Sequence, residues 1–215
     1  VQTCALPICM SARVFRISFS GELAYEINVP AWHGLAMWLA VMDAGRAFDL
    51  TPYGTESMHV VRAEKGYIII GQETDGTVTP DDLGMDWIVS KQKDFIGKRS
   101  FTRIDTARKD RKQLVGLLPT NPAFVATEGA HLVNDAQHAQ HHPQHGSPSQ
   151  GHITSSYYSP NLHTGFALAL LTNGRARQGQ TVYCVTAQGL QAMQITDPVF
   201  FDPEGKRRDG LDAHA

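Results

Sequence analysis

The second half of the chain is a succession of short apolar runs without any helical period. Turn residues separate these runs, which are KQLVGLL, GAHLV, GHITSSYY, FALALL, QTVYCVTA and LQAMQIT, all of them after Arg108. Short apolar runs bounded by Gly, Pro, Asn and Asp are typical of β-strands in barrels and sandwiches. The pattern therefore predicts a small all-β barrel or sandwich, which we place at residues 109–215.

The first half of the chain mixes two periodicities. Residues 15–29 alternate apolar and polar side chains on both sides of Ser20-Gly21-Glu22, which predicts a β-hairpin. After Pro30, apolar residues recur at helical spacing up to Gly45, which we expect to end this helix in a left-handed conformation. These helical positions are Leu35, Trp38, Leu39 and Met42.

Two further helices are expected in this half. The first begins near Thr55, a suitable N-cap, and stops at Gly66, and the second is an amphipathic helix over residues 97–108. The predicted fold is therefore an α+β domain at residues 11–108 followed by the β-domain. Residues 1–10 precede the first strand pattern and lack the positive flank and cleavage site of a signal peptide, so we treat them as an appendage.

Composition excludes several classes of protein. The net charge of −2 gives no broad basic face for nucleic acid, and no apolar run approaches the length of a membrane span. Three scattered cysteines favour a reducing, cytoplasmic setting over a disulfide framework. There is also no Gly-rich dinucleotide fingerprint, phosphate loop or Gly-x-Ser-x-Gly elbow, so the chain does not supply a complete active site by itself.

A polar, histidine-rich stretch at residues 136–150 interrupts the β-domain. Its histidines have spacings that one helix face could use for a metal, but Pro143 interrupts such a helix, and no cysteine or carboxylate anchor is close. We expect an exposed loop without bound metal. Cys184, within a strand pattern, is expected to be a small core residue.

Glu22 is the first candidate for a binding residue, because a tight turn needs the glycine beside it but not the carboxylate. It is either a solvated turn residue or an acceptor of paired hydrogen bonds from a planar N–H donor such as a pterin. Arg62 and Glu64 are open to two interpretations as well. In the first, Arg62 is a cation in the last turn of the helix and Glu64 is its local ion-pair partner. In the second, Arg62 is a partly buried cation that requires a carboxylate, phosphate or ligand as its partner.

Several stretches together resemble one family. They are FSGELAYEINVP, YGTESMHVVRAEKGYIIIGQETDGTVTPDDLGMDWIVSKQKDFIGKRS and, further on, GHITSSYYSPNL, FALALL, GRARQGQTVY and DPVFFDPEGKRRDG. These stretches resemble the C-terminal part of the α subunits of heterotetrameric sarcosine oxidases. More broadly they are similar to the folate-binding half of the glycine cleavage T-protein and dimethylglycine dehydrogenase. The resemblance covers residues 11–210 and leaves residues 1–10 unmatched.

The resemblance implies a ferredoxin-like half of the folate-binding fold and a tetrahydrofolate site. Glu22 then matches the residue that holds the pterin ring, Arg62 lines the pocket, and Tyr67 is a nearby aromatic position. The family's acidic residue that assists one-carbon transfer lies upstream of the matched part, so no catalytic residue is assigned. FAD, FMN, NAD and the β, γ and δ subunits are expected only in the intact enzyme, and this piece alone is expected to be inactive.

Three functions stay open at this point. The first is the tetrahydrofolate site of a sarcosine oxidase α subunit, which captures the carbon of oxidised sarcosine as methylene-tetrahydrofolate and leaves glycine. The second is an aminomethyltransferase of the glycine cleavage system, which receives its carbon from a lipoyl carrier protein. The third is a folate-binding module without transfer chemistry. The amino-acid sequences of the stretches SFSGELAYEINVP and MDWIVSKQKDFIGKRSF favour the first function.

Overall fold

The computed structural model of the chain describes residues 2–5, 10–134 and 148–211, and it contains two compact units. One unit comprises Val1–Arg62 and Glu204–Ala215, and the other comprises Ala63–Pro203. The predicted fold class, an α+β domain followed by an all-β barrel, is confirmed. The two compact units divide between Arg62 and Ala63, whereas the barrel strands themselves begin at Lys112.

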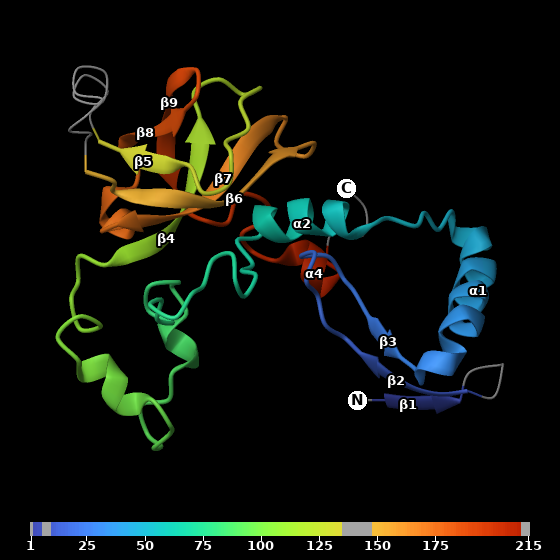
Figure 1. Cartoon of the computed structure of the whole chain (residues 1–215). Coiled ribbons are helices and arrows are strands. Elements are labelled where there is room, and N and C mark those ends of the chain that lie inside the picture. Colours follow the sequence, from blue (N-terminus) through green and yellow to red (C-terminus); the bar gives the residue numbers. More distant parts are fainter. Residues whose placement is uncertain (1, 6–9, 135–147, 212–215) are drawn as a thin grey trace. The chain divides into compact units, whose positions relative to one another are not determined.

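The first unit contains a three-stranded antiparallel sheet in the order β1-β2-β3 (Figure 1). The strands are β1 (Gln2–Ala5), β2 (Ser11–Phe15) and β3 (Glu26–Asn28). β1 pairs with β2 from Gln2 opposite Val14 to Ala5 opposite Ser11. Residues 1–10 were expected to be an appendage outside the fold, but Gln2–Ala5 forms the edge strand of this sheet.

The predicted hairpin is present, but its paired part is shorter than expected. β2 and β3 pair only from Arg13 opposite Asn28 to Phe15 opposite Glu26, so residues 16–25 form a loop instead of continuing the strands. In this loop Gly21 has a φ of 83°, and its N–H donates to the Ser18 hydroxyl at 3.0 Å. Hydroxyl–backbone bonds replace ladder bonds here, because such side chains compete locally with strand pairing.

The helices of the first unit follow the prediction closely. A short 3₁₀ turn (Ala31–His33) leads into α1 (Gly34–Gly45), and Met37 of α1 is buried with Met10 and Ala12. The expected left-handed stop at Gly45 is wrong, since Gly45 has a φ of −74° and a second 3₁₀ turn (Arg46–Phe48) follows it. The left-handed residue that ends this helical stretch is Asp49, which has a φ of 51°.

Helix α2 (Thr55–Glu64) matches the predicted second helix and is followed by Gly66, whose φ is 66°. A Cβ at this glycine would lie 2.7 Å from the carbonyl oxygen of Pro198, so a larger residue would clash. The predicted third helix is wrong. Its residues form a 3₁₀ turn (Lys98–Thr102) followed by further turns, and Ile104, which would belong to the apolar face, is 92% exposed.

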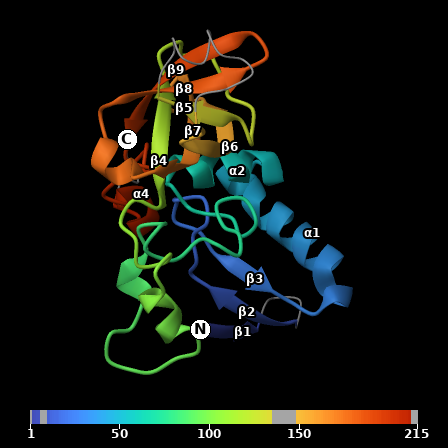
Figure 2. The same ribbon diagram turned by 60° about the vertical axis from the view of Figure 1, so that its left-hand side comes forward.

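The second unit contains a closed six-stranded barrel in the order β4-β7-β6-β5-β8-β9 (Figures 1 and 2). All six apolar runs of the sequence form its strands. They are β4 (Lys112–Pro119), β5 (His131–Val133), β6 (Gly151–Ser159), β7 (Thr164–Thr172), β8 (Thr181–Thr186) and β9 (Gly189–Thr196). Closure leaves no exposed sheet edge, so the barrel and not the sandwich is correct.

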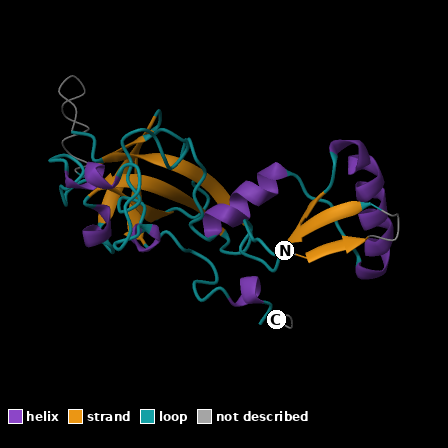
Figure 3. Cartoon of the chain, turned by 90° about the horizontal axis from the view of Figure 1, so that it is seen from below, coloured by secondary structure: helices purple, strands orange, loops and turns teal. Residues whose placement is uncertain are grey.

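Alternate residues of each barrel strand form the core of the barrel. In β7, Ala167, Ala169 and Leu171 belong to the buried core cluster, whereas Phe166, Leu168 and Leu170 face the other side of the sheet. Burial of alternate apolar side chains is what the two-residue period of a strand requires. In Figure 3 the barrel strands form one group, and the helical turns of this unit lie outside them. One more element, α4 (Lys206–Asp209), follows the barrel in sequence and belongs to the first unit.

Candidate functional site

Glu22 lies in the loop 16–25, where the sequence placed it at the tip of a hairpin. Its side chain is 47% exposed, and one carboxylate oxygen, Oε1, pairs with Nη1 of Arg207 at 2.9 Å. Arg207 belongs to α4, 185 residues further along the chain. Arg207 could not be predicted from sequence, because nothing local relates a C-terminal Arg-Arg pair to this loop.

Arg62 and Tyr67 flank the end of α2. The Arg62 side chain is fully buried, with 0% of its surface exposed, and Tyr67 is partly buried. The division between the units falls directly after Arg62, so Glu22 and Arg62 belong to one unit and Tyr67 to the other. Full burial of a guanidinium fits the interpretation of Arg62 as a buried cation better than that of a surface residue favoured by the helix dipole.

Glu64 is not the local ion-pair partner that one interpretation made of it. Its buried carboxylate accepts hydrogen bonds from the Ser159 hydroxyl at 2.6 Å and from the Asn161 side-chain amide at 2.9 Å. Its backbone carbonyl accepts from the N–H groups of Phe200 and Phe201. These contacts attach the end of α2 to the loop after β6 and to the segment after β9.

Two further buried charges anchor the segment between α2 and the barrel. Lys65 pairs with Asp202 at 3.1 Å, and both side chains are less than a tenth exposed. Glu73 is fully buried and accepts hydrogen bonds from the Ser155 hydroxyl at 2.5 Å and from the Ile69 N–H at 2.8 Å. Ser155 stands at a register shift of β6, where the β-bulge turns its side chain toward this segment.

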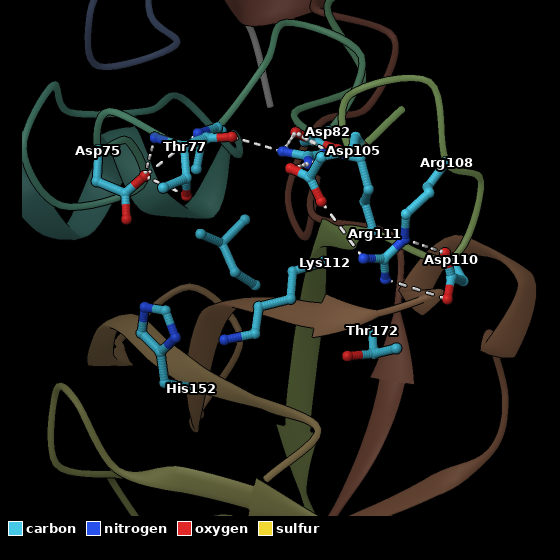
Figure 4. A pocket seen from close by; sticks show the side chains of 12 residues that line it. Asp75, Thr77, Asp82, Asp105, Arg108, Asp110, Arg111, Lys112, His152 and Thr172 are labelled. Atoms are coloured by element: carbon cyan, nitrogen blue, oxygen red, sulfur yellow. Dashed lines mark hydrogen bonds and ion pairs between the residues drawn. The ribbon is translucent and has the colours of Figure 1, made fainter. Parts of the chain in front are cut away.

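A highly charged cavity lies on the outside of the barrel and has a volume of about 300 Å³ (Figure 4). Arg111 crosses it. Its Nε donates to Oδ1 of Asp82 at 2.9 Å, its Nη2 donates to Oδ2 of the same carboxylate at 2.9 Å, and its Nη1 donates to Asp105 at 2.7 Å. Asp82 is 2% exposed and also accepts hydrogen bonds from Thr79. A bidentate, nearly buried pair of this kind fixes the loop that carries Asp82.

The pKa values in this cavity reflect its charges. Burial alone would raise the pKa of the Asp82 carboxyl, but hydrogen bonds from Arg111 and Thr79 outweigh burial and hold that pKa below its ordinary value. The pKa of His152 is lowered, first by burial and then by the neighbouring charges of Lys112 and His131, against a smaller opposite effect of Asp75. The His152 ring is therefore neutral at neutral pH.

No group of three or more potential metal ligands occurs among residues 2–5, 10–134 and 148–211. The predicted histidine loop lies between β5 and β6, but residues 135–147, and hence His138, His141, His142 and His145, lie outside the described residues. Cys184 is fully buried in the barrel core, as predicted, and burial raises the pKa of its thiol. In the described part of the chain, no helix combines the length and the apolar character needed to cross a membrane.

Two family models match the chain in succession. The GCVT N-terminal domain matches residues 3–93, and the glycine cleavage T-protein C-terminal barrel domain matches residues 112–202. The chain belongs to the glycine cleavage T-protein family. The N-terminal match begins at residue 3, so it includes part of the segment that the sequence analysis left as an unmatched appendage. The second match coincides with the closed barrel.

Within this T-protein family, the chain is similar to proteins with two kinds of name. The chain is 55% identical over 201 residues to the sarcosine oxidase subunit alpha of Corynebacterium sp. (strain P-1). This match covers 94% of the chain and 20% of that subunit. The chain is 29% identical over 163 residues to the aminomethyltransferase of Thermotoga petrophila, which covers 76% of the chain and 41% of that protein. The chain thus spans about a fifth of the length of the first of these relatives.

A solved structure confirms the fold. The crystal structure of glycine cleavage system aminomethyltransferase T from Bartonella henselae superposes with a TM-score of 0.71 at 22% sequence identity. The match covers 87% of this chain and 49% of that one. At this level of identity the superposition shows the fold alone.

Proposed function

We propose that this chain is the tetrahydrofolate-binding part of a sarcosine oxidase α subunit. In this function the one-carbon unit of oxidised sarcosine is captured as methylene-tetrahydrofolate, and glycine is left. The observation that carries the proposal is the 55% identity over 94% of the chain to a sarcosine oxidase subunit alpha, nearly twice the identity to the aminomethyltransferase of Thermotoga petrophila. FAD, FMN, NAD and the β, γ and δ subunits belong to the intact enzyme in this proposal.

The geometry of Glu22 is compatible with a pterin ligand. Arg207 occupies one oxygen of the carboxylate, and a carboxylate accepts hydrogen bonds through both oxygens. The second oxygen of this half-exposed side chain can therefore accept from a planar N–H edge, while Arg207 holds the group in place. Arg62, which belongs to the same unit as Glu22, contributes a buried positive charge to the site in this proposal. Tetrahydrofolate itself supplies the nitrogen atoms that accept the one-carbon unit.

The test is made on the intact enzyme assembled with its partner subunits, supplied with sarcosine with and without tetrahydrofolate. Hydrogen peroxide, formaldehyde and methylene-tetrahydrofolate are measured together. We expect tetrahydrofolate to replace formaldehyde by methylene-tetrahydrofolate while the peroxide yield is unchanged. Formaldehyde that stays equal to peroxide at saturating tetrahydrofolate would contradict the proposal. Transfer from an aminomethylated lipoyl carrier protein, with no turnover of sarcosine, would instead support the aminomethyltransferase.

A further inference from the structure

The cavity on the outside of the barrel contains two nitrogen-bearing side chains, Lys112 and His152, that take no part in its network of ion pairs. Lys112 begins β4, and His152 lies near the start of β6. In the barrel, Lys112 is opposite Thr172 of β7, and Leu170 of β7 is opposite His152. Because Leu170 and Thr172 are two residues apart, they share one face of β7, so these four residues line the cavity from three neighbouring strands.

The remaining charges of the cavity have partners of their own. Arg111 is bound by Asp82 and Asp105, and Arg108 pairs with Asp110 at 2.9 Å. In the part of the chain that the structure describes, no hydrogen bond or ion pair engages the Lys112 ammonium or the His152 ring. Figure 4 shows the Lys112 side chain extending toward the His152 imidazole, away from the Arg108–Asp110 pair.

Asp75 limits what kind of anion suits this place. Its Oδ1 accepts hydrogen bonds from the N–H and hydroxyl of Thr77, both at 2.7 Å, which hold the carboxylate at the rim of the cavity. A fixed negative charge here disfavours a ligand that carries two negative charges. Val78 and Leu170 add apolar surface to the lining, which suits a ligand with a hydrocarbon part.

We propose that this cavity binds a small monocarboxylate between the Lys112 ammonium and the His152 imidazole, with the Thr172 hydroxyl as a further donor. The proposal concerns a site on the barrel that is separate from Glu22, and it does not depend on the folate function. Val78 and Leu170 contact the carbon atoms of the ligand. A charged donor and a ring N–H facing one another across a cavity are suited to the two oxygens of a carboxylate.

The experiment titrates the full 215-residue chain with sodium acetate at constant ionic strength and follows the His152 imidazole by NMR. The groups that act on His152 are Asp75, Lys112 and His131, and an added carboxylate favours the protonated ring. We therefore expect acetate to raise the His152 pKa and to bind with a Kd on the order of millimolar, as befits a ligand with few atoms.

Lys112→Gln is expected to weaken acetate binding at least about tenfold, because it removes the charged donor. Lys109→Gln, which makes the same charge change at an exposed residue outside the cavity lining, is the matched control and should leave binding unchanged. The proposal is overturned if His152 does not respond to acetate, if both lysine variants behave alike, or if inorganic phosphate binds more tightly than acetate with the same dependence on Lys112.

Discussion

The Glu64 carboxylate at the end of α2 accepts a 2.6 Å hydrogen bond from the hydroxyl of Ser159, 95 residues further along the chain at the end of β6. Both side chains are buried. Ser159 also accepts the Leu162 N–H at 2.9 Å and so fixes the loop from which Asn161 reaches the same carboxylate. The Ser159 hydroxyl therefore holds Glu64 both directly and through the loop that carries Asn161.

Ser159→Ala is expected to lower the free energy of unfolding by about 1.5–3 kcal/mol, because it deprives a buried carboxylate of a charge-assisted hydrogen bond. Urea unfolding followed by circular dichroism measures this loss. Ser57→Ala is the control, since Ser57 is exposed on α2 and alanine is favourable in a helix. Equal stability of the two variants would show that the Glu64–Ser159 contact is dispensable.

The ion pair between Arg111 and Asp82 offers a second test, because it fixes the loop that carries Asp82 to the start of the barrel. Arg111→Met leaves the carboxylate of Asp82 buried without its cation, so we expect a loss of about 3–5 kcal/mol in the free energy of unfolding. Arg108→Met is the matched control three residues earlier in the sequence. Its ion pairs with Asp105 and Asp110 are exposed, and it should change stability little. Similar losses in both variants, measured by urea unfolding, would refute this difference.

The same ion pair makes stability depend on pH. The folded-state pKa of Asp82 lies below its ordinary value of 3.8, so the ionised carboxylate stabilises the fold. This contribution is complete above the ordinary value and is lost as the pH falls through the lowered folded-state value. We therefore expect the difference in unfolding free energy between the wild type and Asp82→Asn to be constant from pH 7 to about pH 5 and to shrink below about pH 4. A difference that stays constant to pH 3 would contradict this assignment.

The barrel strands could be predicted from sequence because their signal is local. Each strand is a short apolar run between turn residues, and closure of the barrel then follows from the need to pair every strand edge. Helix α2 was equally predictable, since it begins at Thr55, as expected, and the left-handed Gly66 follows its end. Such patterns do not depend on what the segment packs against.

The incorrect predictions concern segments whose structure depends on what they pack against. Residues 16–25 alternate like strands, yet Ile17, Leu23 and Tyr25 are 48%, 45% and 59% exposed, and alternation alone cannot tell a paired strand from an extended loop. Residues 97–108 carry an amphipathic pattern without a partner surface for the side chain of Ile104. The partners of Glu22, Glu64 and Asp82 lie 185, 95 and 29 residues away, so only the folded chain reveals them.

The last prediction concerns Glu22 in the intact enzyme. Charge-assisted hydrogen bonds contribute about 1.5–3 kcal/mol, so Glu22→Gln should weaken tetrahydrofolate binding roughly ten- to a hundredfold. Arg207→Gln should weaken it less, because it removes the residue that orients the carboxylate and leaves the acceptor in place. Peroxide formation from sarcosine should be unchanged in both variants, while formaldehyde rises at the expense of methylene-tetrahydrofolate. Fluorescence titration with tetrahydrofolate gives the affinities.

Glu26→Gln is the comparison that decides whether Glu22 is the right residue. Glu26 lies four residues further on, in β3, and its exposed carboxylate has no hydrogen-bond or ion-pair partner among residues 2–5, 10–134 and 148–211. If only Glu22→Gln weakens folate binding, the carboxylate that is paired with Arg207 is the group that binds the pterin edge. If the loss follows Glu26→Gln instead, the folate site stands but its acceptor is the neighbouring strand residue. If neither variant changes folate affinity or the formaldehyde yield, both carboxylates are merely solvated residues, and the assignment of the pterin site to this loop fails.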